Sequence, residues 1–240
     1  MPASAPPHRG DLTPTRAPAA RTAADGWRPR LVLSGLHVAF EQLLRRGLRG
    51  VWLRGELPPG PIVLAANHHS WWDAFVLLAV LRQQNRRGAL LMAGANLRRF
   101  PFLRRIGVLS TAELRSALAA VRGQQVLIVF PEGKLRAAGV PGPLLPGATW
   151  LAATAPATLA VAAIRVGMRG HQWPEAYVEL QAGPAREDGL PDTLAAVVDA
   201  LDRRLAQADP ERPPLDFRQL VRGRRDWDER LSSLARRLRR

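Results

Sequence analysis

Short runs of apolar residues alternate along the chain with stretches in which apolar positions recur every three or four residues. The runs at 62–66 and 126–130 are continuous and apolar, as expected of buried strands. Helical patterns at 74–82, 112–122 and 147–155 lie between several of the runs. This alternation predicts an α/β fold with a largely parallel, roughly seven-stranded sheet and helices on both faces. The predicted strands cover residues 50–56, 62–66, 89–93, 107–110, 126–130, 159–166 and 176–182.

Two amphipathic segments flank the predicted core. Residues 27–49 place leucines and Phe40 at three- and four-residue steps, with arginines at both ends, which predicts an amphipathic helix. After a proline-rich break, residues 216–240 are expected to form a last basic helix with Trp227 in its apolar stripe. The first helix either packs on the core or lies in a membrane interface, with its arginines at the level of the lipid headgroups. The last helix is either a solvated tail or an anchor on an anionic membrane.

These patterns divide the chain into four parts. Residues 1–26 form a basic leader rich in Pro and Ala and are expected to be disordered. The amphipathic helix at 27–49, a central domain at 50–208 and a basic amphipathic tail at 209–240 follow. A helix is expected at 193–208, and the strand at 176–182, which alternates in polarity, is expected at the edge of the sheet.

Composition and charge narrow the chemistry. The 240 residues include no Cys, which excludes disulfides, thiolate metal sites and a Cys nucleophile. The five His are scattered except for His68 and His69, so no metal site is indicated. The net charge of +15 calls for an anionic partner, either nucleic acid or anionic lipid. Because no nucleic-acid-binding motif is present, a membrane surface is expected and nucleic acid is not.

The segment NHHSWWD at 67–73 lies where a predicted strand gives way to a helix. Ligands of open α/β sheets bind at such strand ends, where the next helix offers unpaired N–H groups. On a helix that begins near His68 or His69, the Asp73 carboxylate could fold back to one imidazole nitrogen and leave the other for substrate. Alternatively, His68 caps the helix and Asp73 is a first-turn acid favoured by the helix dipole.

A second predicted strand, at 126–130, runs into the charged turn PEGKLR at 131–136. By itself this turn could be an ordinary solvated loop. Together the two segments resemble the glycerolipid acyltransferase family that includes the 1-acylglycerol-3-phosphate acyltransferases, whose hallmarks are NHxSxxD followed by FPEG. The resemblance covers about residues 61–166.

The resemblance implies transfer of a fatty acyl group from acyl-CoA or acyl carrier protein to a hydroxyl of a lysophospholipid-like acceptor, in phospholipid synthesis and without a further cofactor. By this resemblance His68 is the general base and Asp73 its orienting partner. His69 is the competing base, ranked lower because its spacing to Asp73 differs. The residues assigned to substrate binding are Ser70, Glu132, Gly133, Lys134 and Arg136.

Two departures from the family pattern concern phosphate recognition. The family usually carries an Arg at a strand end between the hallmarks, whereas residues 106–111 contain none. Arg104, Arg105 or Arg115 could replace it. The basic residues of 134–136 are also displaced by one position from the family's Thr-Arg-Ser. An acceptor without a phosphate, such as a glycolipid, a glycosylated carotenoid or an amino-acid lipid, is therefore the alternative.

The expected location is the cytoplasmic side of the cell membrane, as a peripheral protein. No stretch reaches the roughly 18 to 20 apolar residues that a membrane-spanning helix requires. Residues 1–26 also lack the apolar region of a signal peptide. Outside the acyltransferase class, the alternative is a non-catalytic basic protein that binds membranes or nucleic acid.

Overall fold

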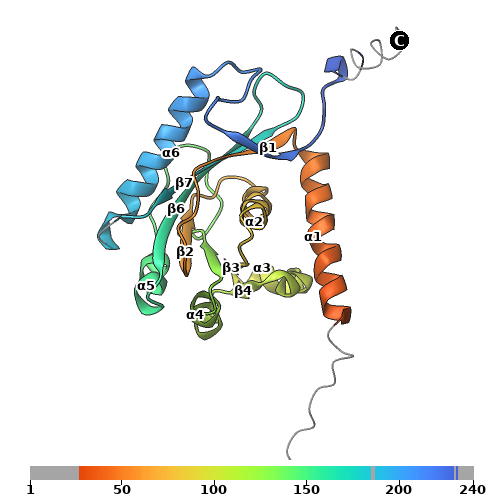
Figure 1. Ribbon diagram of the computed structural model, residues 1–240. Helices are drawn as coiled ribbons and strands as arrows, with labels where there is room; N and C mark the ends of the chain where they lie inside the picture. Colours follow the sequence, from red (N-terminus) through yellow and green to blue (C-terminus); the bar gives the residue numbers. More distant parts are fainter. Residues whose placement is uncertain (1–26, 185–186, 230, 232–240) are drawn as a thin grey trace, which may run out of the picture.

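The computed structural model describes residues 27–184, 187–229 and 231, so the predicted leader and the end of the tail lie outside it. The described chain forms one eight-stranded sheet in the order β4-β3-β5-β2-β6-β7-β1-β8 (Figure 1). The strands are β1 (Gly50–Arg54), β2 (Ile62–Ala66), β3 (Gly88–Met92), β4 (Val108–Ser110), β5 (Val126–Val129), β6 (Thr158–Gly167), β7 (Glu175–Ala182) and β8 (Arg218–Arg222).

Most neighbouring strands run parallel, as the alternating pattern predicts. β2 is parallel to both β5 and β6, and β3 is parallel to both β4 and β5. The pairing of β1 with β7 is also parallel. Only two pairings among the described strands are antiparallel, β6 with β7 and β1 with β8. The prediction of a largely parallel α/β sheet is therefore confirmed.

Helices cover both faces of the sheet because alternate residues of each strand point to opposite sides. In β2, Ile62 and Leu64 belong to one buried cluster, and Val63 and Ala65 belong to the other. The first face is covered by α1 (Trp27–Gly47), α2 (Asp73–Gln83), α3 (Gly94–Arg99) and the 3-10 turn η2 (Pro101–Ile106). The second is covered by α4 (Leu114–Arg122), α5 (Gly147–Thr154) and α6 (Leu190–Gln207), which follows the short turn η3 (Glu187–Gly189).

The prediction of a helix over 216–240 is wrong for residues 216–226, whereas residues 227–229 and 231 are helical. Arg218–Arg222 forms β8, which pairs with β1 and buries Val221 in the core. The sheet thus extends past the boundary predicted at residue 208. None of the helices in the described ranges is both long and apolar enough to span a bilayer.

The strand at the predicted sheet edge is an interior strand, so that prediction is also wrong. β7 lies between β6 and β1, and its two glutamates are buried in ion pairs. Glu179 is paired with Arg54 and Glu175 with Arg49. The alternation in polarity therefore marks buried ion pairs here, not exposure to solvent.

One edge of the sheet gathers the ends of strands that carry the candidate chemistry. β2, β5 and β6 are parallel, so their carboxyl ends lie together. Because β7 runs antiparallel to β6, β7 and its parallel neighbour β1 begin at this edge, and β8 ends there. We call it the carboxyl edge.

Candidate active site

The turn between β2 and α2 is organised around one carboxylate oxygen. Oδ2 of Asp73 accepts hydrogen bonds from the backbone N–H groups of His69 and Ser70, both at 2.8 Å, and lies 2.9 Å from Nδ1 of His68. The Asp73 side chain is fully buried. α2 begins at Asp73 itself, later than the predicted start near His68 or His69, and the carboxylate folds back over the turn that precedes the helix.

The His68 ring is fixed on two sides and open on a third. It stacks on Phe130 with ring centres 4.1 Å apart and an angle of 16° between the planes. Its Nδ1 faces Asp73, which favours the tautomer with the proton on Nδ1 and the lone pair on Nε2. No described residue forms a hydrogen bond with Nε2, and the side chain is 21% exposed. This is the arrangement that a general base requires.

Glu132 connects the two candidate turns. Its Oε1 accepts the backbone N–H of His68 at 2.8 Å, and its Oε2 accepts the N–H of Gly142 at 3.0 Å. The N–H of Arg136 in turn donates to the carbonyl of His68 at 2.8 Å. The buried Glu132 carboxylate thus positions the turn between β2 and α2 (residues 67–73), which we call the catalytic turn. Its role in binding the acceptor stays a prediction.

His69, the competing base, is built into the sheet. Its Nε2 accepts the backbone N–H of Val166 at 3.2 Å, and its side chain is only 6% exposed. Burial lowers the pKa of His69, against the opposing effect of Asp73, so the neutral ring is favoured. Because the Nε2 lone pair already accepts a hydrogen bond, His69 is a poor candidate for the base.

Asn67 and Arg165 support the site, although sequence analysis did not identify either. The Asn67 side chain both donates to the carbonyl of Ile164, at 3.1 Å, and accepts its N–H, at 2.8 Å, which extends the pairing of β2 with β6. Arg165 bonds the two carboxylate oxygens of Asp202 at 2.5 and 2.7 Å and the carbonyl of Gly139 at 2.7 Å. It thereby ties the loop after β5 to β6.

The remaining predicted binding residues lie around the same two turns. The Ser70 hydroxyl accepts the N–H of Trp72 at 3.2 Å. Gly133 has a φ of 68°, a left-handed conformation that favours glycine, and Lys134 is exposed. The Arg136 guanidinium lies against Gly142, and its buried Nε has no hydrogen-bond partner among the described residues.

The end of β4, where the family Arg is missing, is occupied by an ion pair. Arg104 donates to both oxygens of Glu113, at 2.9 and 3.0 Å. Glu113 also accepts the backbone N–H of Ser110 at 2.7 Å. The hydrogen bond from Arg104 is the main reason that the pKa of Glu113 is lowered. Of the arginines considered as replacements, Arg104 is therefore already paired, and Arg105 and Arg115 are exposed.

The comparisons with known proteins agree with this geometry. Residues 51–165, which include both candidate turns, match the family model described as Acyltransferase. This segment is an acyltransferase domain. The chain also resembles the crystal structure of the 1-acyl-sn-glycerophosphate (LPA) acyltransferase PlsC from Thermotoga maritima, with 18% identity and a TM-score of 0.53 over 75% of this chain and 81% of that chain. No curated protein sequence matches the chain.

The acyltransferase domain shares its fold with PlsC, and at this identity the likeness to PlsC shows the fold alone. A second structure, the pilus retraction motor PilT with bound ADP, matches at 9% identity over 61% of this chain and 54% of that chain. Its TM-score of 0.30 is too low to bear on the fold or the function. In the described ranges, no group of three or more His, Asp or Glu side chains could hold a metal ion in this domain.

Proposed function

We propose that the enzyme transfers a fatty acyl group from acyl-CoA or acyl carrier protein to the hydroxyl of a lysophospholipid-like acceptor, in phospholipid synthesis. The single observation that carries the proposal is the His68 ring, with Nδ1 held 2.9 Å from Asp73 and Nε2 left for substrate. The acyltransferase match of residues 51–165 supports the reaction class. The 1-acyl-sn-glycerophosphate named for PlsC supports a lysophospholipid-like acceptor.

The reaction follows from the ring's orientation. His68 Nε2 removes the proton of the acceptor hydroxyl as its oxygen attacks the carbonyl carbon of the thioester. The tetrahedral intermediate then collapses, the C–S bond breaks, and the imidazolium returns the proton to the departing thiolate. Buried Asp73 fixes the tautomer and stabilises the imidazolium between these steps. General base catalysis of this kind contributes about 10²- to 10⁴-fold to the rate, and no cofactor is required.

Several N–H groups of the turn between β2 and α2 are already used within the turn and cannot stabilise the developing oxyanion. The N–H groups of His69 and Ser70 both donate to Asp73, and that of Trp72 donates to the Ser70 hydroxyl. These three N–H groups are therefore not available to the oxyanion, and the basic turn with Lys134 and Arg136 lies beside His68. A cation there would stabilise the negative charge that forms on the carbonyl oxygen.

An acceptor without a terminal phosphate is the second candidate. A phosphomonoester is normally bound by arginines in bidentate, charge-assisted hydrogen bonds. At the end of β4, Arg104 is not free to bind a phosphate, because Glu113 holds it. This observation favours a glycolipid, a glycosylated carotenoid or an amino-acid lipid, with the same chemistry at His68.

We also propose that the protein works at the cytoplasmic face of the membrane as a peripheral protein. Its acceptor and acyl chains are lipids, and its net charge of +15 suits an anionic surface. Leu44 in the last turn of α1 and Leu48 just after the helix are buried, so the end of α1 packs on the domain.

The proposed function is tested by incubating the purified protein with labelled acyl-CoA or acyl carrier protein and a total lipid extract. Label in one lipid class, formed by the wild type and not by His68→Ala, supports the proposal and identifies the acceptor. Label that remains on the thioester, or appears only as free fatty acid, contradicts it.

The two acceptor classes are separated by competition. We expect 1-acylglycerol-3-phosphate to be a poorer acceptor than a lipid without a terminal phosphate, unless Arg136 replaces the missing family Arg. The measurement is the ratio of the two products for the wild type and for Arg136→Ala. Loss of phosphate-acceptor use in Arg136→Ala alone would assign the phosphate to that residue. A strong phosphate preference that survives both Arg136→Ala and Arg104→Ala would show that other groups bind it.

A further inference from the structure

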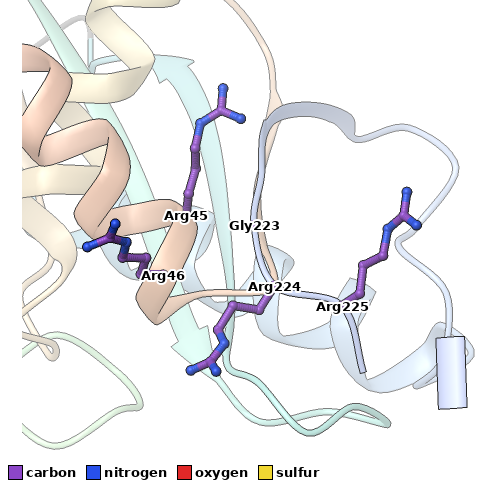
Figure 2. Close-up of a pocket in the computed structure, with 5 residues that line it drawn as sticks. All are labelled: Arg45, Arg46, Gly223, Arg224 and Arg225. Atoms are coloured by element: carbon purple, nitrogen blue, oxygen red, sulfur yellow. The ribbon is translucent and has the colours of Figure 1, made fainter. Parts of the chain in front are cut away.

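Four arginines line a hollow of about 580 Å³ where the end of α1 meets the segment after β8. Figure 2 shows its lining, which consists of Arg45, Arg46, Gly223, Arg224 and Arg225. We call it the arginine hollow. No acidic residue of the described chain lines it. The side chains spread around it instead of converging on one point, an arrangement that suits several anionic groups on a surface.

Backbone contacts fix the two segments that form the arginine hollow. The N–H groups of Gly223 and Arg224 donate to the carbonyls of Arg49 and Leu48, both at 2.9 Å. A Cβ on Gly223 would lie 2.0 Å from the Leu48 carbonyl oxygen, so only glycine allows this approach. The Arg224 guanidinium lies 3.4 Å from the centre of the Trp173 ring. The hollow is therefore a defined feature of the fold.

Most of the charge in the arginine hollow is not neutralised by the protein. Arg45 is bound by Glu41, which lies one turn earlier in α1. In the described part of the chain, no carboxylate comes within ion-pair distance of Arg46, Arg224 or Arg225. Two of these, Arg46 and Arg225, are exposed. Guanidinium groups held close together without counter-charges attract an external anion.

A second hollow at the same corner of the molecule shows the opposite arrangement. There Arg49 is paired with Glu229 at 3.0 Å, and His171 lies 2.6 Å from Asp226. These paired groups hold the chain after β8 against the β6–β7 connection. These side chains form ion pairs within the protein, whereas Arg46 and Arg225 form none with the described residues.

The arginine hollow lies on the carboxyl edge, close to the candidate active site. A Cβ on Gly47, which follows Arg46, would lie 2.1 Å from the ring of Trp72, the neighbour of Asp73. Trp71 in the catalytic turn is 59% exposed, and Trp227 beyond the hollow is 63% exposed. Exposed Trp beside arginines is typical of a surface that enters the headgroup region of a bilayer. Loops at this edge also expose Leu135, Val140, Leu145 and Met168.

We propose that the arginine hollow binds the phosphates of an anionic lipid bilayer and docks the carboxyl edge on that membrane. The inference rests on the proposed function, because a lipid acceptor and acyl chain reach His68 most directly from a bilayer that touches this edge. The unpaired arginines require an anionic surface. The exposed aliphatic side chains at the same edge favour a bilayer over nucleic acid, whose backbone offers them no apolar contact.

The test is binding to vesicles that contain phosphatidylglycerol and phosphatidylcholine, measured by co-sedimentation. The double variant Arg46→Gln, Arg225→Gln is expected to bind about 25-fold more weakly than the wild type, since each arginine near an anionic surface contributes about fivefold. The matched control is Arg87→Gln, Arg218→Gln, which removes the same charge from exposed residues at the opposite edge. The control is expected to bind within about threefold of the wild type.

Three results would overturn the proposal. One is equal weakening in both double variants, which would show that overall charge and not the arginine hollow binds the vesicles. Another is release by inorganic phosphate beyond that by sodium chloride of equal ionic strength, which would indicate a site for a soluble anion. The third is tighter binding to RNA than to vesicles. Because vesicle binding needs no turnover, failure of the proposed acyl transfer would be seen separately.

Discussion

At the scale of single residues, two adjacent histidines have opposite environments. His68 keeps an open Nε2 beside the charged turn, whereas His69 is buried and uses its Nε2 to accept the N–H of Val166. Spacing to Asp73 ranks His68 first in the sequence, but only the structure shows why His69 is present. The His69 side chain accepts a hydrogen bond from the backbone of β6 at a point beyond the end of β2, where β2 no longer pairs with it.

A pH-dependent stability is expected from buried His69. Burial lowers its pKa in the folded protein, so below the ordinary value of about 6.5 the unfolded chain binds the extra proton more readily. The free energy of unfolding therefore falls as the pH drops from about 7.5 to about 5. His69→Gln should lose less over this range than the wild type. Denaturant titrations at each pH measure the two slopes, and equal slopes would contradict this assignment.

At the scale of elements, α1 is joined to the catalytic turn through ring packing on α2. The end of α1 lies under Trp72, whose ring occupies the space where Gly47 has no side chain. Phe40 of α1 also contacts Phe75 of α2, with ring centres 5.1 Å apart. The helix thus supports the residues that precede Asp73.

Two glycines of α1 provide a matched test of this packing. Gly47→Ala is expected to destabilise the protein by about 1–3 kcal/mol, because the added methyl overlaps the Trp72 ring. Gly35→Ala meets no atom within 4 Å and should stabilise by up to about 1 kcal/mol through helix propensity. Denaturant unfolding measures both changes. Similar values for the two variants would show that Trp72 does not depend on Gly47.

Continuous apolar runs predicted the central strands and both candidate turns well. β2 and β5 are buried on both faces, so their sequences contain no polar alternation that could mislead. β8 could not be predicted in this way. Its five residues, RQLVR, are polar at three positions, and it is a strand only because β1 presents a free edge to it. The apolar stripe around Trp227 indicated a helix instead.

Sequence analysis predicted those residues of the candidate site that lie close together along the chain, and missed those that act through distant elements. His68 and Asp73 share one short segment between β2 and α2, and Glu132 follows the end of β5, so local spacing points to each of them. Asn67 and Arg165 act through partners on other elements, Ile164 and Asp202, and no local pattern connects them. The contact of Glu132 with the His68 N–H likewise depends on β5 lying beside β2.

At the scale of the whole molecule, ion pairs within the protein decide which charged side chains remain available to bind a partner. The net charge of +15 describes no particular surface, and many arginines are held in ion pairs. The arginine hollow is distinguished by its lack of counter-charge on the carboxyl edge. Deleting the tail from residue 216 would not test this surface, because it would also remove β8 and the buried Val221. Point substitutions are therefore required.

The most direct test of His68 as the general base is the rate of acyl transfer by His68→Ala beside His69→Gln, with circular dichroism and thioester binding as controls. His68→Ala should lose about 10²- to 10⁴-fold in rate while it keeps its fold and binds the donor. His69→Gln should retain a substantial fraction of the rate. Equal losses in the two variants, or a loss confined to His69→Gln, would contradict the assignment of His68 as the base.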